Sequence, residues 1–431
     1  IINPNEGIFM STFSPSGVIR ISTSYVPAEG HGASISPATY AGDEKSGRSA
    51  GAAWTESTPM RTLDAKGNIV LGASKPSVII DSQASQTTRA ENALWELRDE
   101  LSLPGIVVSE PETDVLKDVF EAAFDKAVKA GKISANYDKE ALMRDYLTRL
   151  NFKESNISSW TLPHRHIDGL IRIATTDSSG NTSKEVWKEK GELYHRMISA
   201  SPQQLKTLMT LSPNSLLYGF WLASGAPLLH KVARSYSYDI SGYGANKVSY
   251  GSTKMSTLPT DASLRYVENK EGDLVEGNSG KRASEMLLGS VPSFSTKNVT
   301  AESILGSGAI TSGALWANVN KDKGGTSMEQ KEAAFDALMH LGILGSMATL
   351  QQWDLRSGTS LIPERTFFTE ITPQGQKSLD FGTFDEFKSE TLGAIQRAQE
   401  LEIFGTAEDR EVVYAGKSLA TVSASAFLSG L

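Results

Sequence analysis

The clearest change of hydrophobic period in the chain falls within residues 75–101. Its first part, Val78 to Ile80, is a β-branched run of the kind typical of a buried strand. Apolar residues then recur at the spacing of one helix face, at Ala90, Leu94, Leu97 and Leu101. Between the two parts, Asp81 or Ser82 can accept hydrogen bonds from the free amides of a helix start. The pattern predicts a buried strand that leads directly into a helix with one face in the core.

The other face of this helix is polar and carries no acidic residue. Its residues near the helix start are Ser82, Gln83, Ser85, Gln86 and Arg89. Such a helix N-terminus can hold a phosphate group, because the backbone amides and the helix dipole favour negative charge there. An ordinary capped helix after a buried strand has the same pattern. These residues therefore leave a structural role and a phosphate-binding role open.

The remaining periodic segments alternate between helix and strand. Helices are expected at 115–131, 138–150, 183–200, 202–211, 327–347 (amphipathic) and 384–401. Strands are expected at 18–26, 105–110, 162–180, 215–225, 350–363 and 412–414. Residues 31–60 show no period and predict a long surface loop. The chain is thus expected to be of the mixed α and β class.

Charge is segregated along the chain, and this changes what the net charge implies. The formal net charge of −8 argues mildly against a nucleic-acid partner, whose binders usually show a basic footprint. Residues 223–258, however, contain four bases, Lys231, Arg234, Lys247 and Lys254, and only one acid, Asp239. Between 380 and 411 there are nine acids and three bases. A local basic surface is therefore compatible with an acidic protein.

The basic segment is also rich in aromatic residues. Tyr236, Tyr238, Tyr243 and Tyr250 lie among its bases. Bases of RNA stack on aromatic rings while Lys and Arg meet phosphates, so this composition suits RNA. An edge hairpin with one exposed face fits the same residues, and both interpretations stay open.

The sequence offers little for catalysis, metals or membranes. There is no cysteine, which excludes disulfides and thiolate chemistry and fits a cytoplasmic protein. Lys281 and Arg282 follow a glycine but miss the phosphate-loop pattern. His164 and His166 would share one face of the expected strand, but no nearby carboxylate completes a metal site. No apolar run approaches the roughly 20 residues of a membrane helix. We expect no catalytic residue, metal, cofactor or membrane contact.

Four blocks, in this order, resemble one family. They are VIIDSQASQTTRAENAL (78–94), LSPNSLLYGFWLASG with VARSYSYDIS (211–241), SEMLLGSVP with VTAESIL (284–305), and LQQWDLRSGTSLIP (350–363), and LPHRHIDGLIR (162–172) is a weaker match. The chain is similar to the backbone subunit of type I-G (formerly I-U) CRISPR effector complexes, in the RAMP superfamily. Two departures stand out. Thr88 replaces an expected asparagine, and Gly358 and Thr359 stand where a second arginine is expected.

The resemblance implies a fold for the whole chain, 1–431, as a single subunit. The expected class is α+β, with an RRM-like (ferredoxin-type) palm, an inserted helical subdomain and a thumb hairpin. The helical insertion is expected at 111–160 and the thumb at 238–266. A loop-rich N-terminal part, 1–75, and an acidic C-terminal segment, 380–431, complete the expected organisation.

The resemblance also implies a function. Members bind the backbone of the CRISPR RNA, polymerise head to tail along it as a helical filament, and recognise a target DNA strand through the guide. Other expected partners are the large subunit and a fused subunit that caps or processes the guide end. The subunit is expected to be a non-catalytic scaffold. The alternatives are a RAMP-type endoribonuclease, for which Asp43 and Glu44 could supply acids, and a structural filament protein without nucleic acid.

Seven further basic residues join the helix-face group as candidate RNA contacts. They are Arg48, Arg234, Lys247, Lys254, Lys281, Arg282 and Arg356. Contacts of this kind would hold phosphates and read no base edges, which a subunit that accepts any spacer sequence requires.

Overall fold

The mixed α+β class is confirmed by the computed structural model, which describes residues 12–42, 50–149, 157–222, 230–254, 265–269, 273–277, 280–282 and 291–430. Within these residues, a curled eight-stranded sheet runs in the order β16-β17-β1-β15-β9-β5-β4, with β18 paired to β17. Its strands are β1 (Val18–Pro27), β4 (Trp54–Leu63), β5 (Ile69–Asp81), β9 (Tyr236–Tyr243), β15 (Ser303–Ile310), β16 (Asp354–Arg356), β17 (Thr359–Thr372) and β18 (Gly375–Leu379).

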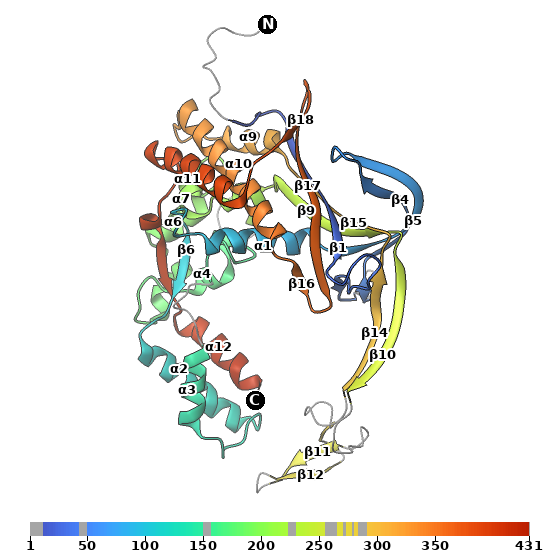
Figure 1. The fold of residues 1–431 in the computed structure, drawn as a ribbon. Coiled ribbons are helices and arrows are strands. Elements are labelled where there is room, and N and C mark those ends of the chain that lie inside the picture. The colour runs from blue at the N-terminus through green and yellow to red at the C-terminus, as the bar shows by residue number, and fades with distance from the viewer. Residues whose placement is uncertain are drawn as a thin grey trace.

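Helices cover one face of the middle of this sheet (Figure 1). The strands β17, β1, β15 and β9 are neighbours and antiparallel, and α1 (Gln83–Glu96) and α10 (Met328–Leu350) pack on them. Ile19 and Ile21 of β1 are fully buried towards the helices, two residues apart, as strand alternation requires. The expected strand at 18–26 and the strand-helix unit at 78–101 are thus both present.

The helix expected at 327–347 is present as α10, but it is buried on nearly all sides and is therefore not amphipathic. It lies between α1 and α11 (Phe384–Glu400), with α9 (Ser312–Val319) beside it. The sequence predicts no membrane helix, yet α10 is long and apolar enough to cross a membrane by length and composition. In this structure 83% of its most apolar window is buried. Its apolar character is explained by packing on both sides.

The hairpin of β4 and β5 curls over the other face of the sheet (Figure 1). Leu63 of this hairpin packs with Tyr243 and Leu305, and Arg365 of β17 donates hydrogen bonds to the carbonyls of Leu63 and Asp64. The outer face of the sheet is therefore partly covered by its own chain.

A second group of elements projects from the body. It contains β6 (Ile106–Ser109), which pairs in parallel with β19 (Glu411–Tyr414), and the helices α2 (Thr113–Lys129), α3 (Lys139–Arg149) and α12 (Lys417–Ser429). The expected strands at 105–110 and 412–414 and the two expected helices are present. The acidic C-terminal segment therefore supplies α12 to the helical projection as well as α11 to the body.

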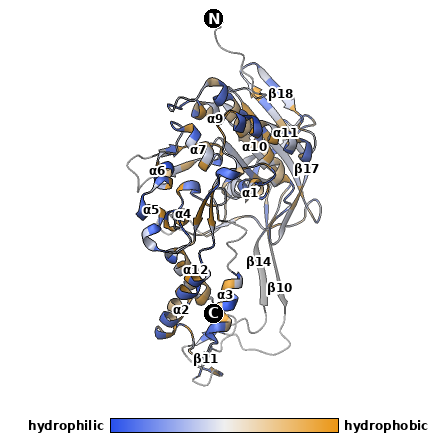
Figure 2. Cartoon of the chain, turned by 90° about the vertical axis from the view of Figure 1, so that its left-hand side faces the viewer, coloured by the Kyte–Doolittle hydropathy of each residue, from blue (hydrophilic) through white to orange (hydrophobic). Residues whose placement is uncertain are grey.

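An arm formed by β10 (Asn246–Lys254) and β14 (Val291–Thr300) leaves the body as a separate two-stranded ribbon (Figure 2). Its distal end carries β11 (Arg265–Glu268), β12 (Leu274–Glu276) and β13 (Lys281–Arg282). The expected thumb at 238–266 needs correction, because 238–243 belong to the central sheet and the partner of β10 is β14. Strand pairing across many residues cannot be read from local period.

The sequence-based assignment fails in two of the middle segments. Residues 162–180 form the 3₁₀ turn η2 (Arg165–Ile167) and α4 (Gly169–Ile173) rather than a strand, and 215–225 begin within α8 (Asn214–Tyr218) before β7 (Phe220–Leu222). Both segments are rich in buried apolar residues, which do not separate strand from helix when the run is short. The remaining elements are β2 (Thr39–Tyr40), β3 (Gly51–Ala52), β8 (His230–Val232), η3 (Thr182–Lys184), α5 (Val186–Glu189), α6 (Glu192–Ser199), α7 (Leu205–Leu211) and η5 (Ala407–Asp409).

Candidate nucleic-acid interface

The start of α1 has the polar character that the sequence predicts. Ser82 is the N-cap, and its hydroxyl accepts a hydrogen bond from the Ser85 amide at 3.2 Å. Gln83 is exposed, and Nη1 of the exposed Arg234 lies 3.4 Å from its Oε1. The first turn contains no acidic residue. The structure therefore brings Arg234, which is distant in sequence, to the helix start, where its charge adds to the favourable helix dipole.

Directly below this surface lies a buried carboxylate, Asp81, with an exposed fraction of zero. Gln86 donates from Nε2 to Asp81 Oδ2 at 2.7 Å, and Arg89 Nε lies 3.8 Å from the same oxygen. Arg356 forms an ion pair with Asp81 Oδ1 and donates to the Ile80 carbonyl at 2.7 Å and the Ser36 carbonyl at 3.1 Å. We call Asp81, Gln86, Arg89 and Arg356 the Asp81 cluster.

The Asp81 cluster gives three of the candidate RNA contacts an internal role. Gln86 is 2% exposed and faces Asp81, so its side chain does not belong to the polar surface. Arg89 donates to the Leu355 carbonyl and keeps 22% of its side chain exposed, and Arg356 keeps 28%. These two arginines hold β5, α1 and β16 together and leave about a quarter of each side chain exposed to solvent.

The turn after Arg356 explains one of the two departures from the family pattern, that at Gly358 and Thr359. Gly358 adopts a φ of +77°, which favours glycine, and its carbonyl accepts a hydrogen bond from the Ser36 amide at 3.0 Å. Thr359 is 1% exposed, and its hydroxyl bonds to both the amide and the carbonyl of Ser36. An arginine at 358 would be strained at this φ, and an arginine at 359 would lose the hydroxyl contacts with Ser36.

A second charged cluster on α1 is sealed inside the protein. Arg165 donates from Nε and Nη2 to the two oxygens of Glu91, each at 2.8 Å, and Asn214 donates to Glu91 Oε1 at 2.7 Å. Burial raises the pKa of the Glu91 carboxyl, and the Arg165 and Asn214 contacts oppose that rise. This Glu91 cluster joins α1 to 162–172 and 211–219. Two of the blocks that resemble the family are thus packed together on α1. The sequence did not indicate this structural role for Arg165.

The histidines beside Arg165 are not brought together on a strand face. His166 is buried against the Phe220 ring at a centroid distance of 4.9 Å, whereas His164 is exposed. The described residues contain no group of three or more His, Cys, Asp or Glu side chains placed to hold a metal ion.

The other basic candidates lie on the arm or outside the described residues. Lys247 is exposed on β10, with Nζ 5.2 Å from the centre of the Trp54 ring, and Lys254 ends the same strand. Lys281 and Arg282 form β13, and Lys281 borders a groove of about 740 Å³ between α2 and α12 together with Lys126, Lys132 and Lys417. Arg48, Asp43 and Glu44 lie outside the described residues.

The tyrosines of the basic segment do not form an exposed surface. Tyr236, Tyr238 and Tyr243 are at most 6% exposed. The hydroxyls of Tyr238 and Tyr25 lie 3.0 Å apart in the core, and burial raises the pKa of both phenols. These three side chains belong to the sheet, and the prediction that they could stack on RNA bases is wrong for them.

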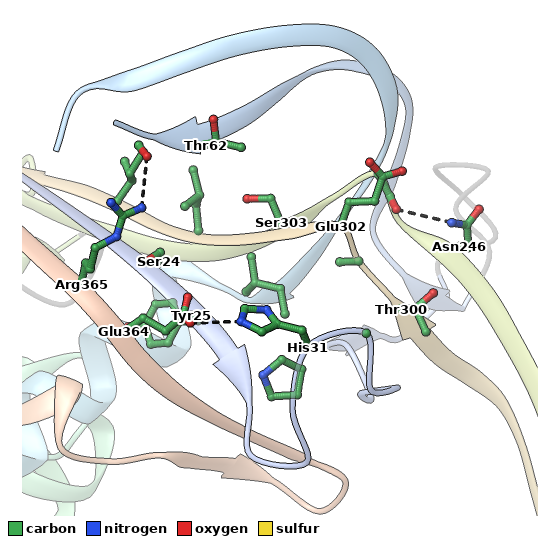
Figure 3. Close-up of a pocket in the computed structure, with 17 residues that line it drawn as sticks. Ser24, Tyr25, His31, Thr62, Asn246, Thr300, Glu302, Ser303, Glu364 and Arg365 are labelled. Atoms are coloured by element: carbon green, nitrogen blue, oxygen red, sulfur yellow. Dashed lines mark hydrogen bonds and ion pairs between the residues drawn. The ribbon is translucent and has the colours of Figure 1, made fainter. Parts of the chain in front are cut away.

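Figure 3 shows a pocket lined by residues of β1, β15 and β17 and by Thr62 and Leu63 of the β4–β5 hairpin, and its volume is about 530 Å³. His31 Nε2 lies 3.2 Å from Glu364 Oε1, and Glu302 is paired with Lys75 at 2.6 Å. The acids of this pocket are thus engaged by neighbouring side chains, and the α1 surface remains the better candidate for an anionic ligand.

The model of the CRISPR-associated protein GSU0053 family matches residues 19–247, just over half of the chain. The chain belongs to this CRISPR-associated family. The match includes the whole of α1, the Glu91 cluster and Arg234, and it confirms the resemblance to CRISPR-associated proteins. No curated protein matches the chain. A solved chain described as "CRISPR RNA-guided surveillance complex, pre-nicking" is similar at 9% identity and a TM-score of 0.33, covering 95% of this chain and 100% of that chain.

Proposed function

We propose that this protein binds the backbone of a CRISPR RNA as the repeated subunit of a type I-G effector complex. The observation that carries the proposal is the start of α1, where the exposed Gln83 and Arg234 and the half-buried Ser82 and Ser85 form an acid-free surface in a member of a CRISPR-associated family. Backbone amides, hydroxyls and a guanidinium suit phosphate and read no base identity.

The fold supports this role. In the sheet β17, β1, β15 and β9 are neighbours, and α1 and α10 pack on the body of the sheet, which supports the proposed ferredoxin-type, RRM-like palm. The β10–β14 arm, with Lys247 on it, is the proposed thumb. The palm holds the guide RNA, and the arm reaches a neighbouring copy in a head-to-tail filament. The filament pairs the guide with target DNA, and the large subunit and the guide-end subunit complete the complex. The protein acts as a cytoplasmic scaffold.

The deciding experiment compares two guide RNAs with unrelated spacers at several salt concentrations. Affinity for both should be equal and should fall steeply with salt, because counterions return to the RNA when the protein leaves. Arg234→Glu should weaken both equally, whereas Arg144→Glu, at a side chain 68% exposed on α3, should change little. A spacer preference that persists at high salt would refute a backbone-binding scaffold.

The scaffold role also predicts that bound RNA stays intact. Purified protein incubated with guide and complementary RNA in the presence of Mg²⁺ should leave both strands uncut on a denaturing gel. Specific cleavage would favour the endoribonuclease alternative.

A further inference from the structure

One large aromatic side chain lies exposed in β7, two residues after Gly219, which packs against the Arg234 backbone. Trp221, in β7, is 65% exposed, while its neighbours Phe220 and Leu222 are 6% and 1% exposed. Strand alternation explains this pattern, because the two flanking side chains anchor β7 in the core and Trp221 must point outward. The outward position leaves the flat face of the indole open to stacking by a ligand.

The surroundings of this indole are basic. Trp221 pairs across the strands with Lys231, whose Nζ lies 5.6 Å from the centre of the indole ring. A cation near an aromatic ring is attracted by its electron-rich face. The described residues of this hairpin and of the following segment, 219–222 and 230–235, contain no acid.

The same hairpin connects to the proposed phosphate site. Gly219, just before β7, lies so close to Arg234 that a Cβ there would be 2.9 Å from the Arg234 amide nitrogen. Arg234 in turn reaches Gln83 at the α1 start. Trp221 contacts Lys231, Lys231 and Arg234 belong to the same short segment, and Arg234 contacts Gln83. These contacts link the indole to the α1 start.

We propose that Trp221 stacks on an unpaired base of the bound RNA while Lys231 and Arg234 meet neighbouring phosphates. This inference rests on the proposed function and names a base-stacking subsite within it. Every nucleobase has a flat aromatic face, so a stacking platform tolerates any sequence. The subsite adds affinity without base-edge readout, and it assigns to Trp221 the stacking role that the buried tyrosines cannot take.

A matched tryptophan supplies the control. Trp353 is 52% exposed but is followed by Asp354 and lines a groove with Phe381 and Asp380. No lysine or arginine of the described residues lies over the Trp353 ring. Trp353→Ala removes another largely exposed indole from an acidic and apolar setting, so it should leave RNA affinity unchanged.

The test measures affinity of the full chain for labelled single-stranded RNA and for an abasic RNA of the same length. Trp221→Ala should weaken binding to normal RNA by about 5- to 150-fold, the range seen when one stacking contact is lost. Trp221→Phe should recover most of the affinity. The salt slope should stay unchanged, because the indole carries no charge. The wild type should prefer normal over abasic RNA, and Trp221→Ala should lose that preference.

The outcomes separate this inference from the proposed function. If Arg234→Glu weakens binding and Trp221→Ala does not, the phosphate site stands and the stacking subsite is wrong. If neither variant changes affinity, both are wrong. A Trp221→Ala protein that binds RNA normally but no longer self-associates would make Trp221 a contact between subunits, which also overturns stacking. Equal losses on normal and abasic RNA would indicate damage to the fold and would likewise refute it.

Discussion

Helix α1 joins two charged clusters of opposite design. In the Glu91 cluster the ion pair of Arg165 and Glu91 is 8% and 7% exposed, and its hydrogen bonds end on protein groups. In the Asp81 cluster the carboxylate is equally buried, but Arg89 and Arg356 keep 22% and 28% of their side chains in solvent. The comparison teaches that burial of an acid does not define its role. What matters is whether the paired cations end inside the protein or at its surface.

The largest expected effect breaks the sealed cluster. Arg165→Met leaves the Glu91 carboxyl buried without its cation, and it should lower the free energy of unfolding by about 3–5 kcal/mol. Urea unfolding measures the loss. The control is Arg144→Met, which removes an exposed pair with Glu140 at 3.8 Å and should cost less than about 0.5 kcal/mol. Similar unfolding midpoints for the two variants would show that the Glu91 cluster does not stabilise the fold.

The open cluster should respond less to the same kind of change. Arg356→Ala removes donors to Asp81, Ile80 and Ser36, but water can reach the vacated rim and Gln86 still holds Asp81. We expect a loss of about 1–3 kcal/mol in urea unfolding. A loss larger than that of Arg165→Met would contradict the distinction between a sealed and an open cluster.

A smaller effect isolates the turn that supports Arg356. Thr359→Val keeps the side-chain shape but removes the hydroxyl that bonds to Ser36, which should cost about 1 kcal/mol. Thr148→Val removes an exposed hydroxyl that donates to the Arg144 carbonyl at 2.8 Å, and its unfolding midpoint should hardly move. If both variants unfold together, the Ser36 contact contributes nothing measurable.

The smallest expected effect concerns the solvent-exposed part of Arg89 and is measured as a change in RNA binding. Arg89→Gln should make the dependence of log affinity on log salt shallower by about one unit or less, because one cation leaves the RNA. Arg98→Gln is a close control just after the same helix, since Arg98 is 24% exposed and also donates to a backbone carbonyl, that of Trp95 at 3.0 Å. Identical salt slopes for Arg89→Gln, Arg98→Gln and wild type would exclude Arg89 from the RNA surface.

Predictions from the sequence succeeded where the signal is local. The strand before α1, the Ser82 cap and the helices at 115–131, 138–150 and 384–401 follow from hydrophobic period and capping residues within one turn or strand. They failed at 162–180 and 215–225, where short, evenly buried segments carry no decisive period. Residue type alone predicts exposure poorly, so only some of the candidate RNA contacts lie at the surface. Gln86 and the three tyrosines are polar or aromatic residues that the structure buries.

By itself, the sequence determined the mixed class, most periodic elements, the segregation of charge and the resemblance to a CRISPR-associated family. Only the tertiary structure decided which charges meet. Asp81 and Arg356 are 275 residues apart, and Glu91 and Arg165 are 74 apart, so neither pair leaves a mark in local spacing. The pairing of β10 with β14 and the outward position of Trp221 beside Lys231 were equally hidden. Hydrophobic period is a property of neighbouring residues, whereas ion pairs, strand partners and exposure depend on where distant segments are packed.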